Sequence, residues 1–180
     1  MTVLEQMVPT GTWQADPLHS SVRIEAQHMG VSTFGAAFKD FDASLVSGPS
    51  GLTLEGSAQV ESFDVQDDQL RPHVLSPEFL DAERHPELRF RSTGFRQDGD
   101  EVIAQGELTI KGITRPVEAR GRVGQPIEDP MGNQHTSVAL ETVIDRTEFD
   151  LGWQMDLPNG GAVLANDVKL LVSLELVKDE

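Results

Sequence analysis

The sequence contains no cysteine, which excludes disulfide bonds and thiolate chemistry. This absence also fits a reducing compartment. A chain of 180 residues can bury a hydrophobic core without covalent cross-links, and its length is that of one domain.

Long apolar runs are also missing. No stretch approaches the roughly 18 consecutive apolar residues of a transmembrane helix, so we expect no integral membrane segment. Residues 1–12 carry neither a basic leader nor an apolar run of about 7–15 residues, so we expect no secretory signal and a cytoplasmic location. We expect residues 1–12 to form a loose arm ahead of a single domain over residues 13–178.

Basic residues are scarce: 14 Lys and Arg stand against 30 Asp and Glu, a formal net charge of −16. Affinity for nucleic acid comes mostly from neutralised phosphates, so we predict that the chain binds no nucleic acid. Anionic membrane surfaces are disfavoured partners for the same reason.

Motifs for catalysis and metal binding are missing as well. The five histidines show neither HxH nor HxxxH spacing, so no metal site is predicted. The chain has no G-x-S-x-G nucleophile motif and no glycine-rich phosphate loop ahead of a helix. We therefore expect no catalytic residue, no catalytic cofactor and no enzyme activity. Asp16 and His19 resemble an acid–base pair, but we expect them to cap and orient a loop.

The sequence is rich in alternation of apolar and polar residues, most clearly over residues 102–123. There, apolar residues at every second position form a column on one face of a strand. This strand is followed by Lys111-Gly112 and by a second strand with its own apolar column, which predicts a β-hairpin. Regular alternation favours an antiparallel sheet with one packed face, and about eight such strands can close into a barrel. We therefore predict an all-β fold, a single antiparallel barrel of roughly eight strands. Further strands are expected at residues 22–28, 34–45, 52–60, 88–91, 138–144 and 168–176.

A short helical insertion is expected around residues 64–85. Ser76 is a candidate N-cap with Pro77 at the first helical position, and Pro86 ends the helix. Phe79 and Leu80 make this segment a candidate plug or lid for the barrel.

The apolar columns are small at their centres, and the residues concerned are Ala26, Gly56, Ala58, Ala104, Gly106, Ala119 and Gly121. Two interpretations remain open: an apolar lumen that holds a ligand, or small residues that ease strand curvature around a plugged core. If the lumen is open, its occupant is apolar, such as a long aliphatic or isoprenoid chain. The predicted ligand-binding residues are Ile24, Ala26, His28, Phe38, Leu54, Gly56, Phe79, Leu80, Phe90, Ala104, Gly106, Leu108, Val138, Leu140 and Leu170.

Two polar residues of the apolar strands admit more than one interpretation. His28 projects from a column that otherwise looks buried. Three interpretations are open: a catalytic base, a polar anchor for a ligand, or a hydrogen-bonded core residue. Arg146 follows an apolar strand, which predicts an ion pair at the barrel rim or a site for an anionic head group. Alternatives to a binding protein are therefore an enzyme acting on an isoprenoid lipid with His28 as base, and an interaction module whose edge strands pair in a homodimer.

Several segments together resemble the YceI-like family of lipocalin-like proteins. They are WQADPLHSSV at 13–22, VSTFGAAF at 31–38, SPEFLDAERHPELRFRSTGF at 76–95, GELTIKGITRPV at 106–117 and RTEF at 146–149. The resemblance implies a lipocalin-like barrel that holds a polyisoprenoid chain, such as the tail of a prenyl quinone, as carrier, storage or sequestering protein. It implies no catalysis. Many members of the family are exported, and the expected lack of a signal peptide indicates its cytoplasmic branch.

Overall fold

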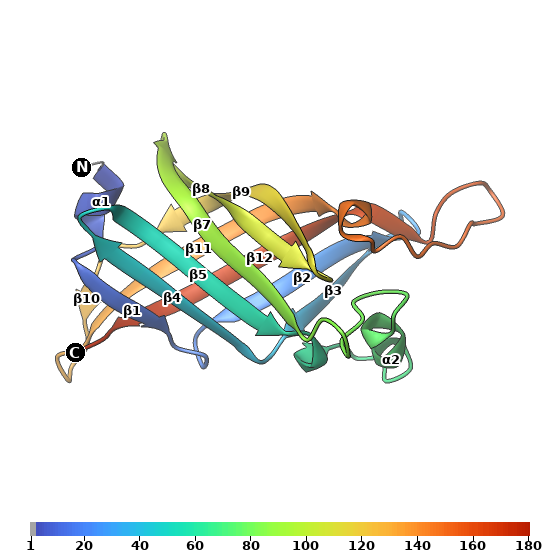
Figure 1. Cartoon of the computed structure of the whole chain (residues 1–180), viewed down its shortest axis with the longest axis horizontal. Coiled ribbons are helices and arrows are strands. Elements are labelled where there is room, and N and C mark those ends of the chain that lie inside the picture. The colour runs from blue at the N-terminus through green and yellow to red at the C-terminus, as the bar shows by residue number, and fades with distance from the viewer. Residues whose placement is uncertain (1–2) are drawn as a thin grey trace.

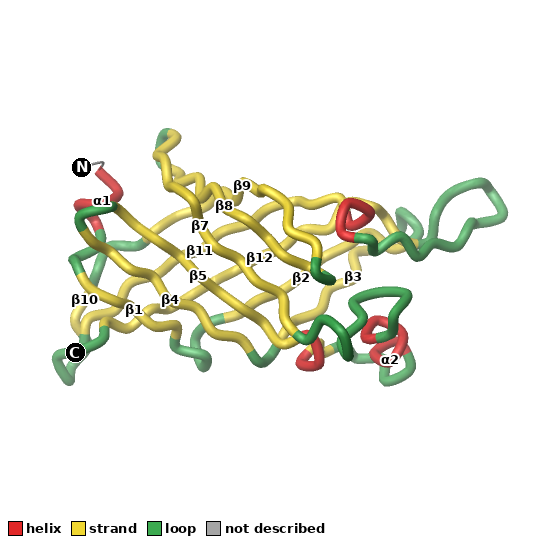
Figure 2. Tube along the Cα trace, viewed as in Figure 1, coloured by secondary structure: helices red, strands yellow, loops and turns green. Residues whose placement is uncertain are grey.

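The strands of this protein form one antiparallel sheet that curls into an elongated barrel (Figures 1 and 2). The computed structural model describes residues 3–180. The helical elements are α1 (Val3–Met7), α2 (Leu70–Leu75) and the 3₁₀ turns η1 (Val60–Ser62) and η2 (Arg146–Phe149). The strands are β1 (Gly11–Ala15), β2 (Ser21–His28), β3 (Ser32–Phe38), β4 (Phe41–Gly48), β5 (Gly51–Gln59), β6 (Phe63–Asp64), β7 (Glu87–Asp98), β8 (Glu101–Ile110), β9 (Ile113–Val123), β10 (Ile127–Glu128), β11 (Gln134–Asp145) and β12 (Leu164–Lys178).

Pairing of β11 with β12 closes the barrel. The sheet order runs β10-β11-β9-β8-β7-β5-β4-β1-β12-β2-β3-β6, and the additional β11–β12 pair joins strands that are far apart in that order. The closed ring is therefore β11-β9-β8-β7-β5-β4-β1-β12, an eight-stranded antiparallel barrel. This confirms the all-β barrel predicted from the alternation. Among residues 3–180, no helix is both long and apolar enough to cross a membrane.

The long strand β12 has two different neighbours on its second edge. Near the C-terminus it pairs with β1, where Ala15 lies opposite Leu176. Toward the N-terminal end of β12 it pairs with β2, where Ser21 lies opposite Ser173. The register therefore shifts across the loop of residues 16–20, and β1 and β2 follow one another along the same edge. This loop lies on the outside of the closed ring.

The predicted central hairpin is confirmed as β8 and β9. Ile110 pairs with Ile113 across the two-residue turn Lys111-Gly112. Both turn residues have positive φ, 52° and 74°, which is the conformation of a type I′ turn. Such a turn twists in the sense that the flanking strands require, so the local sequence fixes the register of this hairpin.

The N-terminal segment closes one end of the barrel, so the prediction of a loose arm is wrong for its described part. Leu4 and Val8 are buried and pack with Trp13, whose side chain has no exposed surface. The Trp13 indole Nε1–H donates to the carbonyl oxygen of Pro9 at 3.1 Å. A short amphipathic turn at this position buries apolar surface that the sequence pattern alone did not assign to the core.

The helical insertion lies within residues 64–85 as predicted, but the helix ends before Ser76 instead of starting there. The helix is α2, and residues 76–85 form turns rather than a helix. Pro72 is tolerated because the backbone N–H groups of a first helical turn have no partner within the helix. The helix ends at Leu75 because the backbone of Ser76 is extended, with ψ of 165°. Asp81, with a positive φ of 49°, then donates its N–H to the carbonyl of Ser76 within the following turns.

Gly121 lies where β9 and β11 approach too closely for a side chain. It lies opposite Leu140 in the β9–β11 pair. A Cβ atom at this position would lie 1.8 Å from the carbonyl oxygen of Ala139, a backbone atom that cannot move aside. At Gly56 the nearest atoms to such a Cβ would lie at 3.5 and 3.7 Å, which is ordinary contact.

We therefore expect Gly121→Ala to lower the free energy of unfolding by about 1–3 kcal/mol, because the methyl group separates β9 from β11. Gly56→Ala is the matched control and should change stability by less than about 0.5 kcal/mol. Urea denaturation followed by circular dichroism measures both. Equal stability of the two variants would contradict the close approach at Gly121.

Candidate ligand-binding cavity

An apolar cavity of about 130 Å³ lies inside the barrel. Two hydrophobic clusters flank it: one around Trp13 at the α1 end and one around Phe63 and Phe149 at the α2 end. Its wall is almost entirely apolar, because β2, β3 and the ring strands other than β1 direct inner apolar residues toward it. The apolar lining residues are Val22, Phe38, Ala43, Leu54, Gly56, Ala58, Leu88, Phe90, Leu108, Ile110, Val117, Ala119, Leu140, Leu170, Val172 and Leu174.

The structure brings only part of the predicted ligand-binding set to this cavity. The predicted residues on its wall are Phe38, Leu54, Gly56, Phe90, Leu108, Leu140 and Leu170. The prediction missed wall residues such as Ala58 and Ala119, although both belong to the small-centred columns that the alternation revealed. That these residues contact a ligand stays a prediction.

The other predicted residues lie elsewhere. Ala104 and Val138 are buried in the cluster at the α1 end, and Leu80 is buried in the cluster at the α2 end. Ile24 packs at the edge of that second cluster, and Ala26 is buried on β2. None of these side chains is on the cavity wall.

Gly106 shows why small residues do not always leave a void. A Cβ atom at Gly106 would lie 2.5 Å from the ring of Phe90 and 2.6 Å from the carbonyl oxygen of Arg91. The space left by the missing side chain is therefore filled by the Phe90 ring, in the manner of an aromatic residue covering a strand glycine. Gly56, in contrast, lies on the cavity wall, and a Cβ atom there would make only ordinary contacts. The small-centred columns thus border the cavity at some positions and are covered by a neighbouring side chain at others.

His28 is exposed, and the prediction that it projects from a buried column is wrong. It pairs with Leu164 at the end of β2, beyond the closed ring. Residues 27–33 are all exposed there. Both faces of the β2–β3 ribbon meet solvent there. The side chain is not on the cavity wall, and none of the wall residues is a histidine.

Arg146 is buried and anchors the loop that follows it. Its Nε donates to the carbonyl oxygen of Ala165 at 3.0 Å, and Nη1 donates to the carbonyls of Leu151 and, at 2.8 Å, Trp153. Nη2 donates to the carbonyl of Leu164 at 3.3 Å. Burial lowers the pKa of the guanidinium below its ordinary value. The expectation of an ion pair at the rim, or of a site for an anionic head group, is replaced by a structural clamp on backbone carbonyls.

Side chains from α2 and from the loop after η2 meet over the same end of the barrel. The rings of His73, Phe79 and Trp153 pack with centroids 4.9–5.4 Å apart. Lys111 Nζ, in the β8–β9 turn, donates to the carbonyls of Pro77 and Asp150, each at 3.0 Å. Phe79 therefore belongs to a cover over this end, which Figure 1 shows around α2 at the right.

The scan of protein families matches a YceI-like domain over residues 13–176. The chain belongs to the YceI-like family. Protein YceI of Escherichia coli is 29% identical over 165 residues, which cover 90% of this chain and 83% of that protein. The crystal structure of BcnA from Burkholderia cenocepacia has a TM-score of 0.72 at 22% identity and covers 92% of this chain and 99% of its own. A domain from Saccharophagus degradans, described as a polyisoprenoid binding domain, has a TM-score of 0.63 at 9% identity and covers 95% of this chain and 100% of its own.

This YceI-like protein depends on Arg146 for the order of its α2 end. Arg146→Met should lower the free energy of unfolding by about 1–3 kcal/mol, because four backbone carbonyls lose a buried donor. Arg146→Lys should recover only part of this loss, since an ammonium lacks the planar fork of donors. Arg122→Met, at an exposed position of β9, is the control and should be nearly neutral. Chemical denaturation measures the series, and a neutral Arg146→Met would refute the clamp.

Proposed function

We propose that this protein binds a long apolar chain of the polyisoprenoid class inside its barrel, and so keeps that chain out of water. The observation that carries the proposal is the apolar cavity between the two hydrophobic clusters. Support also comes from the barrel shared with a domain described as polyisoprenoid binding. A wall without histidine favours binding over the alternative of an enzyme with a histidine base.

The size of the cavity limits how the chain fits. An apolar cavity of about 150 Å³ in another protein admits one benzene molecule. The cavity here, about 130 Å³, has room for a similar group, so a chain of several isoprene units must widen the lumen. Movement of Phe90 would widen it, because the Phe90 ring is part of the wall and lies against Gly106, which carries no side chain.

Hydrophobic burial alone is enough for useful affinity. About ten buried methylene groups contribute roughly 8 kcal/mol of gross transfer free energy. The loss of translational and rotational freedom offsets a large part of it. A gain of about 8 kcal/mol without any offset would correspond to a dissociation constant of about 1 μM, so ten methylene groups alone give weaker binding than that. We therefore expect affinity to rise steeply with chain length and to discriminate weakly between head groups.

The α2 end is the proposed entrance. The α1 end is closed by Leu4, Val8 and the fully buried Trp13. The α2 end is covered by loops, and these are held by side-chain contacts rather than by strand ladders. Loops of this kind open at lower free energy than a sheet does.

Blocking the cavity tests the binding proposal. Ala119→Leu and Ala58→Leu add bulk on the wall and should weaken binding of a fluorescent polyene or a prenyl quinone at least tenfold. Both should raise the melting temperature of the lipid-free protein, because the new side chain fills a void. Ala139→Leu, at an exposed position of β11, is the matched control and should change neither property. Mass spectrometry of an organic extract of the purified protein should reveal an apolar lipid. Absence of any lipid together with unchanged affinity in both cavity variants would overturn the proposal.

Opening the cover tests the entrance. Trp153→Ala removes the ring that joins the loop after η2 to His73 and Phe79, so it should speed association and dissociation of the fluorescent chain several-fold. Because both rates rise, the dissociation constant should change less than either rate. Ile127→Ala, an exposed position on β10 at the opposite end, should leave both rates unchanged. Stopped-flow fluorescence measures the rates, and equal rates in the two variants would contradict an entrance at α2.

A further inference from the structure

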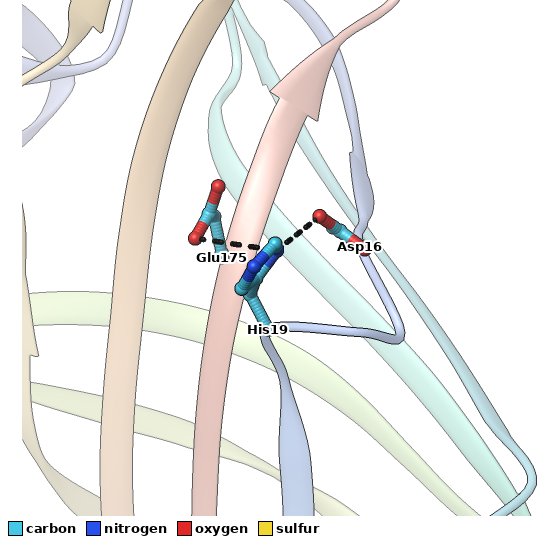
Figure 3. Close-up of side chains that lie close together, drawn as sticks. All are labelled: Asp16, His19 and Glu175. Atoms are coloured by element: carbon cyan, nitrogen blue, oxygen red, sulfur yellow. Dashed lines mark hydrogen bonds and ion pairs between the residues drawn. The ribbon is translucent and has the colours of Figure 1, made fainter.

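Titratable side chains gather on the outside of the barrel where the loop of residues 16–20 crosses β12. Figure 3 shows Asp16, His19 and Glu175 pointing toward one another. His19 Nδ1 lies 2.7 Å from Asp16 Oδ2 and 4.0 Å from Glu175 Oε2. One nitrogen and two carboxylate oxygens thus lie within 4.8 Å of one another.

The geometry points to a binding site for a divalent transition-metal ion, of which Zn²⁺ is the type, with His19 Nδ1, Asp16 and Glu175 as its ligands. Tetrahedral Zn²⁺ with ligands at about 2.0–2.2 Å separates its donor atoms by about 3.4 Å. The observed separations of 2.7 and 4.0 Å lie on either side of that value. Small rotamer changes of solvent-accessible side chains are enough to reach it.

Backbone contacts hold the two halves of this ligand set together. The Asp16 N–H donates to the carbonyl of Glu175 at 2.8 Å, and the Glu175 N–H donates to Ser20 Oγ at 3.0 Å. The second oxygen of Asp16, Oδ1, accepts from the Leu18 N–H at 2.9 Å, so Oδ2 remains directed at His19. The loop is therefore fixed to β12 at the residue that supplies the third ligand.

His135 positions Glu175 from the other side. Its Nδ1 lies 3.0 Å from Glu175 Oε1, and its Nε2 lies 2.9 Å from Asp129 Oδ2. This leaves Glu175 Oε2 for the metal, as in sites where an outer partner orients a ligating carboxylate. Asp129 is itself held by the backbone N–H groups of Met131 and Asn133.

The donor set indicates the class of ion. An imidazole nitrogen with two carboxylates suits Zn²⁺ and similar ions, whereas Ca²⁺ and Mg²⁺ prefer oxygen donors alone. The His19 side chain is 64% exposed, so water can complete the coordination. The site is on the outer surface, away from the cavity wall, and it does not depend on the proposed lipid binding.

Protons compete with the metal at His19. The hydrogen bond to Asp16 is the main reason that the pKa of His19 is raised, and the same bond lowers the pKa of Asp16. The hydrogen bond to Asp129 raises the pKa of His135. A metal at His19 must displace its proton, and protonated His135 adds positive charge beside Glu175. Affinity should therefore fall as pH falls, because protonated His19 cannot ligate the ion.

The test is calorimetric titration of ZnCl₂ into chelator-treated protein that carries no polyhistidine tag, at pH 7.5. We expect one ion per chain with a dissociation constant in the micromolar range or below. His19→Ala should weaken binding at least thirtyfold, and Glu175→Gln at least tenfold. His135→Gln should weaken it by about 10–100-fold, the range found for outer partners of metal ligands. His28→Ala, an exposed histidine at the far end of β2, is the matched control and should leave binding unchanged.

Co²⁺ provides an independent measurement. In the intact chain its visible absorption should show the intense bands of a four- or five-coordinate ion, and His19→Ala should abolish them. Affinity for Zn²⁺ should fall at least tenfold between pH 7.5 and pH 5.5. The proposal is overturned if no saturable binding occurs up to 1 mM Zn²⁺, or if His19→Ala and His28→Ala bind equally well.

Discussion

The pairing of β12 with β11 is the constraint on which the rest of this structure depends. β12 spans 15 residues and pairs with β11 from Asp145–Asp167 to His135–Val177. On its other edge it carries β1 and then β2. Because β12 pairs on both edges, the ring has no free edge there. Closure also requires the other strands to tilt relative to the barrel axis.

Closure explains why small residues occur where they do. Ring closure brings β9 against β11 so tightly that Gly121 has no room for a side chain, because the carbonyl of Ala139 occupies that space. At Gly106 on β8, the ring of Phe90 occupies the space that a side chain would fill. The void that remains is bounded by Gly56, Ala58 and Ala119, where no partner backbone intrudes. The cavity is therefore what is left after closure, and not simply the sum of missing side chains.

β12 also carries both proposed sites, because its side chains alternate between the two faces of the sheet. Leu174 faces the cavity, while Glu175 faces outward toward His19 and His135. The register shift between β1 and β2 occurs opposite this residue, and the five-residue loop that makes the shift supplies Asp16 and His19. One irregularity in the pairing thus assembles a cluster of polar donors on an otherwise regular wall.

The sequence by itself determined the fold class, the β8–β9 hairpin and the apolar face of most strands. These are local properties: alternation follows from the pleat of a single strand, and Lys111-Gly112 adopts its turn without help from the rest of the chain. Only the tertiary structure decided which column residues meet the void, because that depends on how neighbouring strands are staggered. For the same reason the burial of Leu4 and Val8, the exposure of His28 and the carbonyl clamp of Arg146 were missed. No rule of sequence spacing predicts that Asp16 and His19 lie beside Glu175, because residues from opposite ends of the chain become neighbours only when β1 and β12 pair.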